Sequence, residues 1–134
     1  MLKQISIYAE NKKGIMREVT GILLEQNINI LGSVTNDSAE YGIVRMVVSE
    51  PEKACEALQK AGFLCRLKQV IGVEVEDKVG NLHSLLSDLA NTNISVDYLY
   101  LSFNRESGKP IMVFHCDDVA EVAASLSSKG YSVL

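Results

Sequence analysis

The sequence predicts an α+β protein built from two tandem ferredoxin-like βαββαβ units, each an antiparallel sheet with its helices on one face. Three observations lead to this prediction. Strand-like and helix-like segments alternate in the order βαββαβ, and that order then occurs a second time. The second copy also repeats residues of the first 66 positions later, with Gly80 in the place of Gly14 and Asn93 in the place of Asn27. A repeat that keeps element order and glycine positions indicates two copies of one structural unit.

The first unit is expected at residues 1–67. Its strands are predicted where apolar and polar residues alternate, and its helices where apolar residues recur at helical spacing. Pro51 suits the first turn of a helix, and Gly62 suits a helix end. The predicted elements are a strand at Gln4–Ala9, a helix at Ile15–Gln26, a hairpin of strands Ile28–Thr35 and Tyr41–Ser49 around a turn at Asn36–Glu40, a helix from Pro51, and a short strand at Phe63–Leu67.

The second unit is expected at residues 68–134 and repeats this order. No linker rich in glycine, serine or proline precedes it, which favours a fixed pair of units over two independent ones. The predicted elements are a strand at Gln69–Glu76, a helix lined by Leu82, Leu85, Leu86 and Leu89, a hairpin of strands Ile94–Phe103 and Pro110–Cys116, a helix lined by Val119, Val122, Ala123 and Leu126, and a strand at Tyr131–Leu134.

The overall composition narrows the class of function. The net charge of −4 is mild and no stripe of lysines and arginines is present, so nucleic-acid binding is not expected. No apolar run approaches the roughly 18 residues of a membrane helix, and the N-terminus lacks the apolar core of a signal peptide. We therefore expect a cytoplasmic protein that does not bind a membrane.

The cysteines and histidines show no metal-binding pattern. Cys55, Cys65 and Cys116 form no CxxC pair, and their odd number suggests reduced thiols packed as small apolar residues. His115 and Cys116 are neighbours on a strand and should point to opposite faces. We expect no metal and no cofactor.

The loop–helix–strand segments resemble those of ACT domains, small regulatory modules of amino-acid metabolism with the βαββαβ fold. In the first copy, Asn11–Gly14 (Asn-x-x-Gly) follows a strand and precedes an amphipathic helix that runs into Glu25–Ile30. In the second copy, Asp77–Gly80 leads in the same way to Asn93–Val96. The resemblance covers essentially the whole chain and implies a stand-alone pair of ACT domains. In that family, ACT domains pair side by side, and amino-acid effectors often sit at the joint, against the glycine loop.

The resemblance also implies an effector site at the first glycine loop. In the serine-sensing ACT domain of phosphoglycerate dehydrogenase, two asparagines hold the effector, and their places fall here on Asn11 and Asn29. The second copy has Asp77 and Ser95 at those places, and the family's histidine on the first strand is missing from both copies. The first loop is therefore the better candidate, and serine is not implied as the ligand.

The chemistry of the loops agrees with an amino-acid ligand. A glycine lets the backbone come close to a carboxylate, and a helix N-terminus offers N–H donors and positive potential. The amides of Asn11 and Asn29 can accept or donate, whereas Asp77 would repel a carboxylate and attract an ammonium. The candidate ligand-binding residues are Asn11, Lys12, Lys13, Gly14, Ile15, Met16, Asn29, Asp77, Gly80 and Ser95.

Each of these residues also has a purely structural interpretation. Asn11 and Asp77 can satisfy the loop or cap the helix, and Gly14 and Gly80 can serve only to provide a backbone angle. Asn29 can be an ordinary residue at the start of a strand, and the two lysines can simply be solvated.

The favoured function is a non-catalytic regulatory module that binds a free amino acid at the interface between ACT domains. The alternative is an interaction subunit that docks on a metabolic enzyme or a transcription factor without a ligand. An enzyme is not expected, because the first loop lacks the arginine of an acylphosphatase-like site and no nucleophile–base constellation is evident. A ligand can regulate only if it binds two arrangements of the protein with different affinity. We therefore expect the chain to form a homodimer or to bind a partner enzyme or regulator.

Overall fold

The computed structural model describes residues 2–37 and 41–134, so residues 38–40 of the predicted turn lie outside the described residues. The chain divides into two compact units. One comprises Lys3–Lys68, and the other comprises Gln69–Leu134 together with Leu2.

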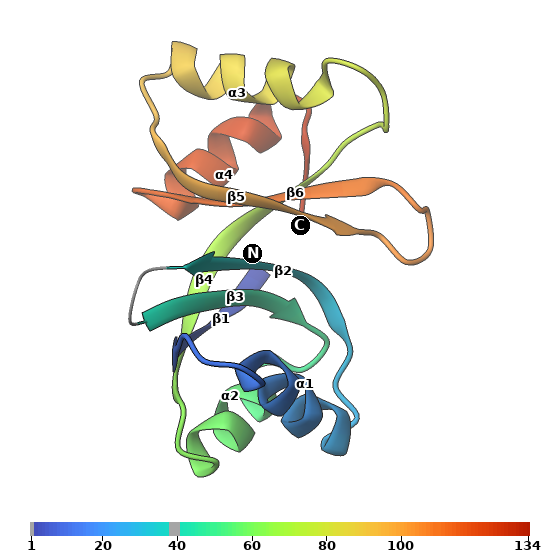
Figure 1. Cartoon of the computed structure of the whole chain (residues 1–134). Helices are drawn as coiled ribbons and strands as arrows, with labels where there is room; N and C mark the ends of the chain where they lie inside the picture. Colours follow the sequence, from blue (N-terminus) through green and yellow to red (C-terminus); the bar gives the residue numbers. More distant parts are fainter. Residues whose placement is uncertain (1, 38–40) are drawn as a thin grey trace. The chain divides into compact units, whose positions relative to one another are not determined.

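The first unit is a sheet covered on one face by two helices (Figure 1). Its elements are β1 (Leu2–Glu10), α1 (Ile15–Glu25), β2 (Ile30–Asp37), β3 (Tyr41–Val48), α2 (Pro51–Lys60) and the first part of β4 (Leu64–Glu74). Strand β3 pairs antiparallel with β1 and β2, and β1 neighbours β4, which gives the order β2-β3-β1-β4. The core of this unit contains Ile5 and Ile7 from β1 together with Val19 and Leu23 from α1 and Leu58 from α2.

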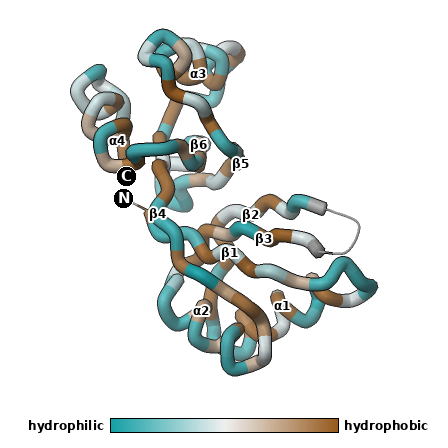
Figure 2. The backbone as a smooth tube through the Cα atoms, turned by 90° about the vertical axis from the view of Figure 1, so that its left-hand side faces the viewer, coloured by the Kyte–Doolittle hydropathy of each residue, from teal (hydrophilic) through white to brown (hydrophobic). Residues whose placement is uncertain are grey.

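The second unit repeats this arrangement. Its elements are the last part of β4, α3 (Asn81–Asn91), β5 (Val96–Phe103), β6 (Pro110–Cys116), α4 (Val119–Ser128) and β7 (Ser132–Val133). The strand order is β7-β4-β6-β5, and neighbouring strands in this order pair antiparallel. Helices α1 to α4 each carry both hydrophobic and hydrophilic residues (Figure 2), as amphipathic helices on a sheet should. The predicted α+β class with two βαββαβ units is confirmed.

The residues that repeat along the sequence adopt the same backbone conformation in both units. Gly14 and Gly80 have φ of 86° and 90° and occupy the N-cap positions of α1 and α3. Asn27 and Asn93 have φ of 57° and 58°, just after the same two helices. This left-handed region is strained for most residues and is tolerated by glycine and asparagine. The repeat therefore preserves the residues that the backbone requires at both ends of each loop–helix segment.

The strands at the junction differ from the prediction. The sequence predicts two strands, Phe63–Leu67 and Gln69–Glu76, but the structure has the single strand Leu64–Glu74. No glycine or proline lies between Leu64 and Ile71, so nothing in the sequence interrupts the strand as it passes from one unit to the next. The closing strand β7 is shorter than predicted.

Candidate functional site

The first glycine loop joins β1 to α1 in a tight turn. The N–H of Lys12 donates to the carbonyl of Glu10 at 2.9 Å, and the N–H of Ile15 donates to the carbonyl of Lys12 at 3.3 Å. Gly14 follows at φ +86°, where an added Cβ would meet nothing within 4 Å. The glycine is thus required by the backbone angle, and it also leaves the approach to the helix end open.

A pocket of about 340 Å³ opens at this loop. Its floor lies where three strands meet, because β3 pairs Gly42 with Ala9 of β1 and Val44 with Thr35 of β2. Its volume is within the range of small-molecule pockets. The lining residues are Ala9, Glu10, Asn11, Lys12, Gly14, Ile15, Met16, Arg17, Thr35, Gly42 and Val44.

The start of α1 offers hydrogen-bond donors at this pocket. The N–H of Glu18 closes the first helical turn on the carbonyl of Gly14 at 3.0 Å. Within the described residues, the N–H groups of Met16 and Arg17 have no backbone acceptor. Unpaired amides at a helix N-terminus carry partial positive charge and can hold a carboxylate.

Side chains add charge around these donors. Lys12 and Arg17 line the pocket, whereas Lys13 is exposed and does not. The Nζ of Lys12 lies 3.9 Å from Oε2 of Glu10, and because both side chains are well exposed this ion pair is weak. Asn11 lines the pocket, and the N-cap position belongs to Gly14, so Asn11 is not the N-cap residue of α1.

The second glycine loop has the same backbone geometry. The N–H of Lys78 donates to Glu76 at 3.0 Å, that of Asn81 donates to Lys78 at 3.3 Å, and that of Ser84 donates to Gly80 at 2.9 Å. A pocket of about 530 Å³ opens beside it. The lining residues are Glu76, Asp77, Lys78, Gly80, Asn81, Leu82, His83, Leu86, Leu101, Pro110 and Met112.

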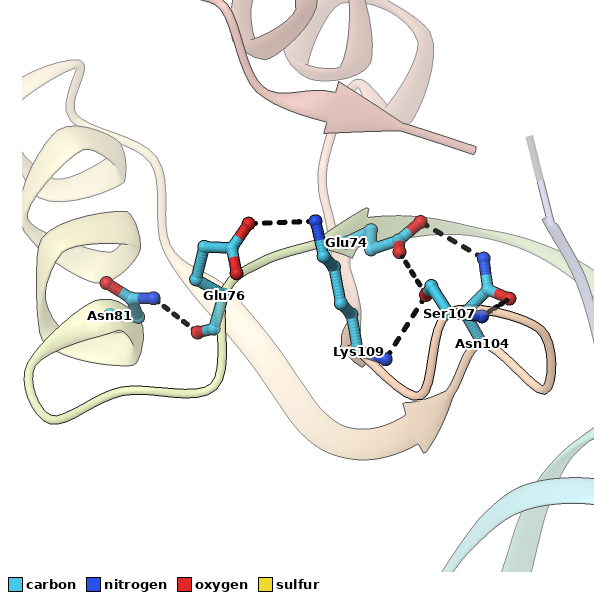
Figure 3. Close-up of polar contacts among 6 residues, drawn as sticks. All are labelled: Glu74, Glu76, Asn81, Asn104, Ser107 and Lys109. Atoms are coloured by element: carbon cyan, nitrogen blue, oxygen red, sulfur yellow. Dashed lines mark hydrogen bonds and ion pairs between the residues drawn. The ribbon is translucent and has the colours of Figure 1, made fainter.

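A polar cluster links the second loop to the turn between β5 and β6 (Figure 3). Glu74, at the end of β4, accepts hydrogen bonds from Oγ of Ser107 at 2.7 Å and from Nδ2 of Asn104 at 3.2 Å. These two donors hold the pKa of the Glu74 carboxyl below its usual value. The turn is thereby fixed to the strand that leads into the glycine loop.

Glu76 extends this cluster into the loop itself. Its carboxylate pairs with Nζ of Lys109 at 2.8 Å, which raises the pKa of Lys109. Its carbonyl accepts a hydrogen bond from the side-chain amide of Asn81, at the start of α3 (Figure 3). In the first unit, Tyr8 and Ile15 occupy the places of the β4 carboxylate and the α3 amide, so these two members of the cluster have no counterpart there.

Comparisons with known families and structures decide the family. The family described as an ACT domain pair matches residues 1–129. The chain belongs to the ACT domain pair family. A crystal structure of a protein from Bacteroides thetaiotaomicron is 30% identical to this ACT domain pair, covers 99% of this chain and 91% of its own, and has a TM-score of 0.90.

Two regulatory subunits of aspartate kinase share the fold of this ACT domain pair. The subunit from Thermus thermophilus, in its ligand-free form, is 19% identical, with 90% of this chain and 85% of its own covered and a TM-score of 0.65. The subunit from Thermus flavus is 17% identical, with 85% and 83% covered and a TM-score of 0.58. No curated protein matches the sequence at a significant level.

Asn29 and Ser95 lie away from the glycine loops of their own ACT domains. The N–H of Asn29 donates to Oγ of Ser49 at 2.9 Å, and its carbonyl accepts from the N–H of Ser49 at 2.9 Å. Asn11 precedes α1 and Asn29 follows it, so the helix separates them and only Asn11 lines the first pocket. Ser95 lines a different pocket of about 470 Å³ beside Asp117. A role in ligand binding stays a prediction for Asn29 and Ser95.

Several residues that line the first pocket are not among the candidates predicted from the sequence. Arg17 stands in the first turn of α1, three residues after Gly14, and this spacing could have indicated that it faces the loop. Thr35, Gly42 and Val44 come from the β2–β3 hairpin. Their position depends on the pairing register, and no local pattern in the sequence specifies it.

His115 has two neighbouring side chains as partners, and the cysteines of the ACT domain pair are buried. Nδ1 of His115 lies 2.7 Å from Oδ2 of Asp97, and its ring stacks on Tyr98. Cys55, Cys65 and Cys116 are free and buried, and burial raises the pKa of the last two. Among residues 2–37 and 41–134, no group of three or more His, Cys, Asp or Glu side chains could hold a metal ion.

Helices long and apolar enough to cross a membrane are absent from the part of the chain that the structure describes.

Proposed function

We propose that this ACT domain pair is a regulatory module that binds a free amino acid at its first glycine loop and performs no catalysis. The supporting observation is the 340 Å³ pocket, which combines free helix amides, two cationic side chains and an apolar floor. The ligand's carboxylate would accept from the N–H groups of Met16 and Arg17. Its ammonium would face the amide oxygen of Asn11 and the carboxylate of Glu10, and its side chain would rest on Val44.

The regulatory part of the proposal concerns what the bound ligand changes. A ligand shifts an equilibrium only if it binds two arrangements with different affinity. We infer that a second ACT domain covers the occupied loop, within a homodimer or in a complex with a metabolic enzyme or another regulator. The regulatory subunits of aspartate kinase support this role because they have the same fold. The three free thiols support a cytoplasmic location.

A thermal-shift screen of the twenty amino acids tests the proposal. One amino acid, or a small group of related ones, is expected to raise the melting temperature. Asn11→Ala and Arg17→Ala should each abolish the rise, since both side chains line the pocket. Lys60→Ala is the matched control, because Lys60 pairs with Glu56 on the exposed surface of α2, 3.1 Å away, and does not line the pocket.

Asn29→Ala tests whether the ligand is held by the first loop alone or also by Asn29 of another ACT domain. Loss of the thermal shift in this variant would indicate that Asn29 reaches the ligand from another ACT domain, since its own domain holds it away from the loop. If none of the twenty amino acids raises the melting temperature, the proposed function is wrong, and a subunit that docks without a ligand becomes the better explanation.

A further inference from the structure

The wall of the second pocket contains exposed leucines. Leu82, Leu86 and Leu101 line it, and these side chains are 37%, 37% and 48% exposed. Leu85 and Leu89, which lie on α3 with Leu82 and Leu86, are buried in the core and only 0% and 2% exposed. Large apolar side chains gathered around one hollow favour an apolar occupant, because covering them removes apolar surface from water.

Two of these three exposed leucines have polar residues in their places in the first unit, whereas the place of Leu82 is taken by Met16. Leu86 and Leu101 stand where the first unit has Thr20 and Thr35. Leu101 lies two residues after Leu99 on β5, and Leu99 is partly buried against the core, so both side chains point to the same face of the sheet. The neighbouring strand places Met112 and Pro110 in the same pocket, where the first unit has the smaller Val44 and Gly42.

The lining of the second pocket also includes polar groups and both signs of charge. Asp77 and Lys78 line the pocket, and within the described residues the N–H groups of Leu82 and His83 have no backbone acceptor. The carboxylate of Asp77 is complementary to an ammonium, and the side chain of Lys78 and the two amides are complementary to a carboxylate. A zwitterion with an apolar tail therefore matches the whole pocket.

We propose that the second pocket binds an amino acid with a large apolar side chain, branched aliphatic or aromatic, and that the two loops of the chain select different ligands. This inference rests on the proposed function, that a glycine loop of this chain binds free amino acids. The ligand's side chain covers Leu82, Leu86 and Leu101. Its ammonium meets Asp77, and its carboxylate meets the start of α3.

Assigned amide spectra of the whole ¹⁵N-labelled chain test the inference, because they report on both loops at once. L-leucine and L-phenylalanine should shift the amide signals of Gly80, Leu82 and Leu101, and L-serine should not. 4-Methylpentanoate, which is leucine without its ammonium, should bind more weakly than leucine, and Asp77→Asn should remove that difference. Equal affinity of the native chain for leucine and 4-methylpentanoate would overturn the amino-acid assignment.

The double variant Leu86→Thr/Leu101→Thr gives the second pocket the side chains of the first unit. It should weaken leucine binding roughly tenfold or more, because it replaces two of the three leucines of the wall with smaller, polar side chains. Leu24→Thr is the matched control: Leu24 is 77% exposed on α1 and lines neither glycine-loop pocket, so leucine binding should be unchanged. Unchanged leucine affinity in the double variant would overturn the inference.

The remaining outcomes separate this inference from the proposed function. If leucine shifts the amide signal of Gly14 and leaves that of Gly80 unchanged, the proposed function survives and the inference is wrong. If no amino acid shifts the amide signal of either glycine, the proposed function and the inference are both wrong. If light scattering shows a dimer that dissociates in the double variant, the leucines are covered by a second copy, and the inference is again overturned.

Discussion

The two glycine loops have nearly the same backbone and different surroundings. Gly14 and Gly80 differ by only 4° in φ, at 86° and 90°, and the turn hydrogen bonds in the two loops agree within 0.1 Å. Around this common backbone the charged residues Lys13 and Arg17 are replaced by Val79 and His83. The backbone conformation requires glycine at one position and leaves the neighbouring side chains free to set the chemistry of each pocket.

The comparison can first be tested on the glycines themselves, where we expect the largest change in stability. Gly14→Ala and Gly80→Ala should each lower the free energy of unfolding by about 1–2 kcal/mol, because alanine is strained at these positive φ angles. The added methyl groups would meet no neighbour within 4 Å, so the cost comes from the backbone rather than from a clash. Urea denaturation of each variant measures the effect.

Gly21→Ala is a control for which we expect a change in the free energy of unfolding of the opposite sign. Gly21 lies inside α1, has no positive φ, and has open space where the methyl group would lie. Alanine there should raise the free energy of unfolding by about 0.5–1 kcal/mol. Equal effects at Gly14 and Gly21 would show that the loop does not need the left-handed angle.

The asparagines after α1 and α3 also have the same backbone conformation in both units, and substituting them should have a smaller effect on stability. Asn27→Ala and Asn93→Ala should each cost about 1 kcal/mol, because asparagine tolerates the left-handed conformation better than alanine does. Asn27→Gly and Asn93→Gly should be neutral or slightly stabilising. Thermal melts of the four variants measure the effects, and two alanine variants as stable as the native chain would contradict the explanation.

The sequence was informative where structure depends on local chemistry. The left-handed glycines, the amphipathic helices and the order βαββαβ all follow from patterns within a few residues of one another. The pocket floors follow from strand pairing between distant segments, so Thr35 and Val44 could not be assigned to the first pocket in advance. The sequence predicts two strands where the structure has the continuous strand β4, because strand periodicity does not show whether two adjoining strands are separate. The distance of Asn29 from the first loop follows from the length of α1 and could have been deduced.

The polar cluster at the second loop should respond to acid, and the first loop should not respond in the same way. The folded-state pKa of Glu74 is lowered, so its contribution to stability is present above the unfolded pKa and is lost as pH falls through the folded value. The turn between β5 and β6 should therefore loosen as pH falls below the usual range of a glutamate carboxyl. The amide signals of Glu106 and Ser107 report this, since both N–H groups donate to Oδ1 of Asn104, at 2.9 and 3.1 Å.

Glu74→Gln identifies the titrating group. Glutamine does not take up a proton as the carboxylate does, so the two turn amides should lose the acid response that they show in the native chain. Glu56→Gln, on the exposed surface of α2, is the control and should leave the acid response unchanged. An acid response that persists in Glu74→Gln would point to a different carboxylate.

A change in ionic strength should produce the smallest of these effects. It should weaken ligand binding more at the first pocket than at the second, because the first pocket is lined by two cations. Lys12 and Arg17 are cations that line the first pocket, and they would attract the carboxylate of the proposed ligand through solvent. Raising the salt concentration from about 20 mM to about 0.5 M shortens the screening length several-fold, so binding at the first loop should weaken by roughly two- to fivefold. Apolar contact dominates the second pocket and is little affected by simple salts, so leucine binding there should change by less than about twofold. Titrations followed at the Gly14 and Gly80 amides measure both affinities in one sample. The opposite ranking would mean that charge, rather than the leucine wall, governs the second loop.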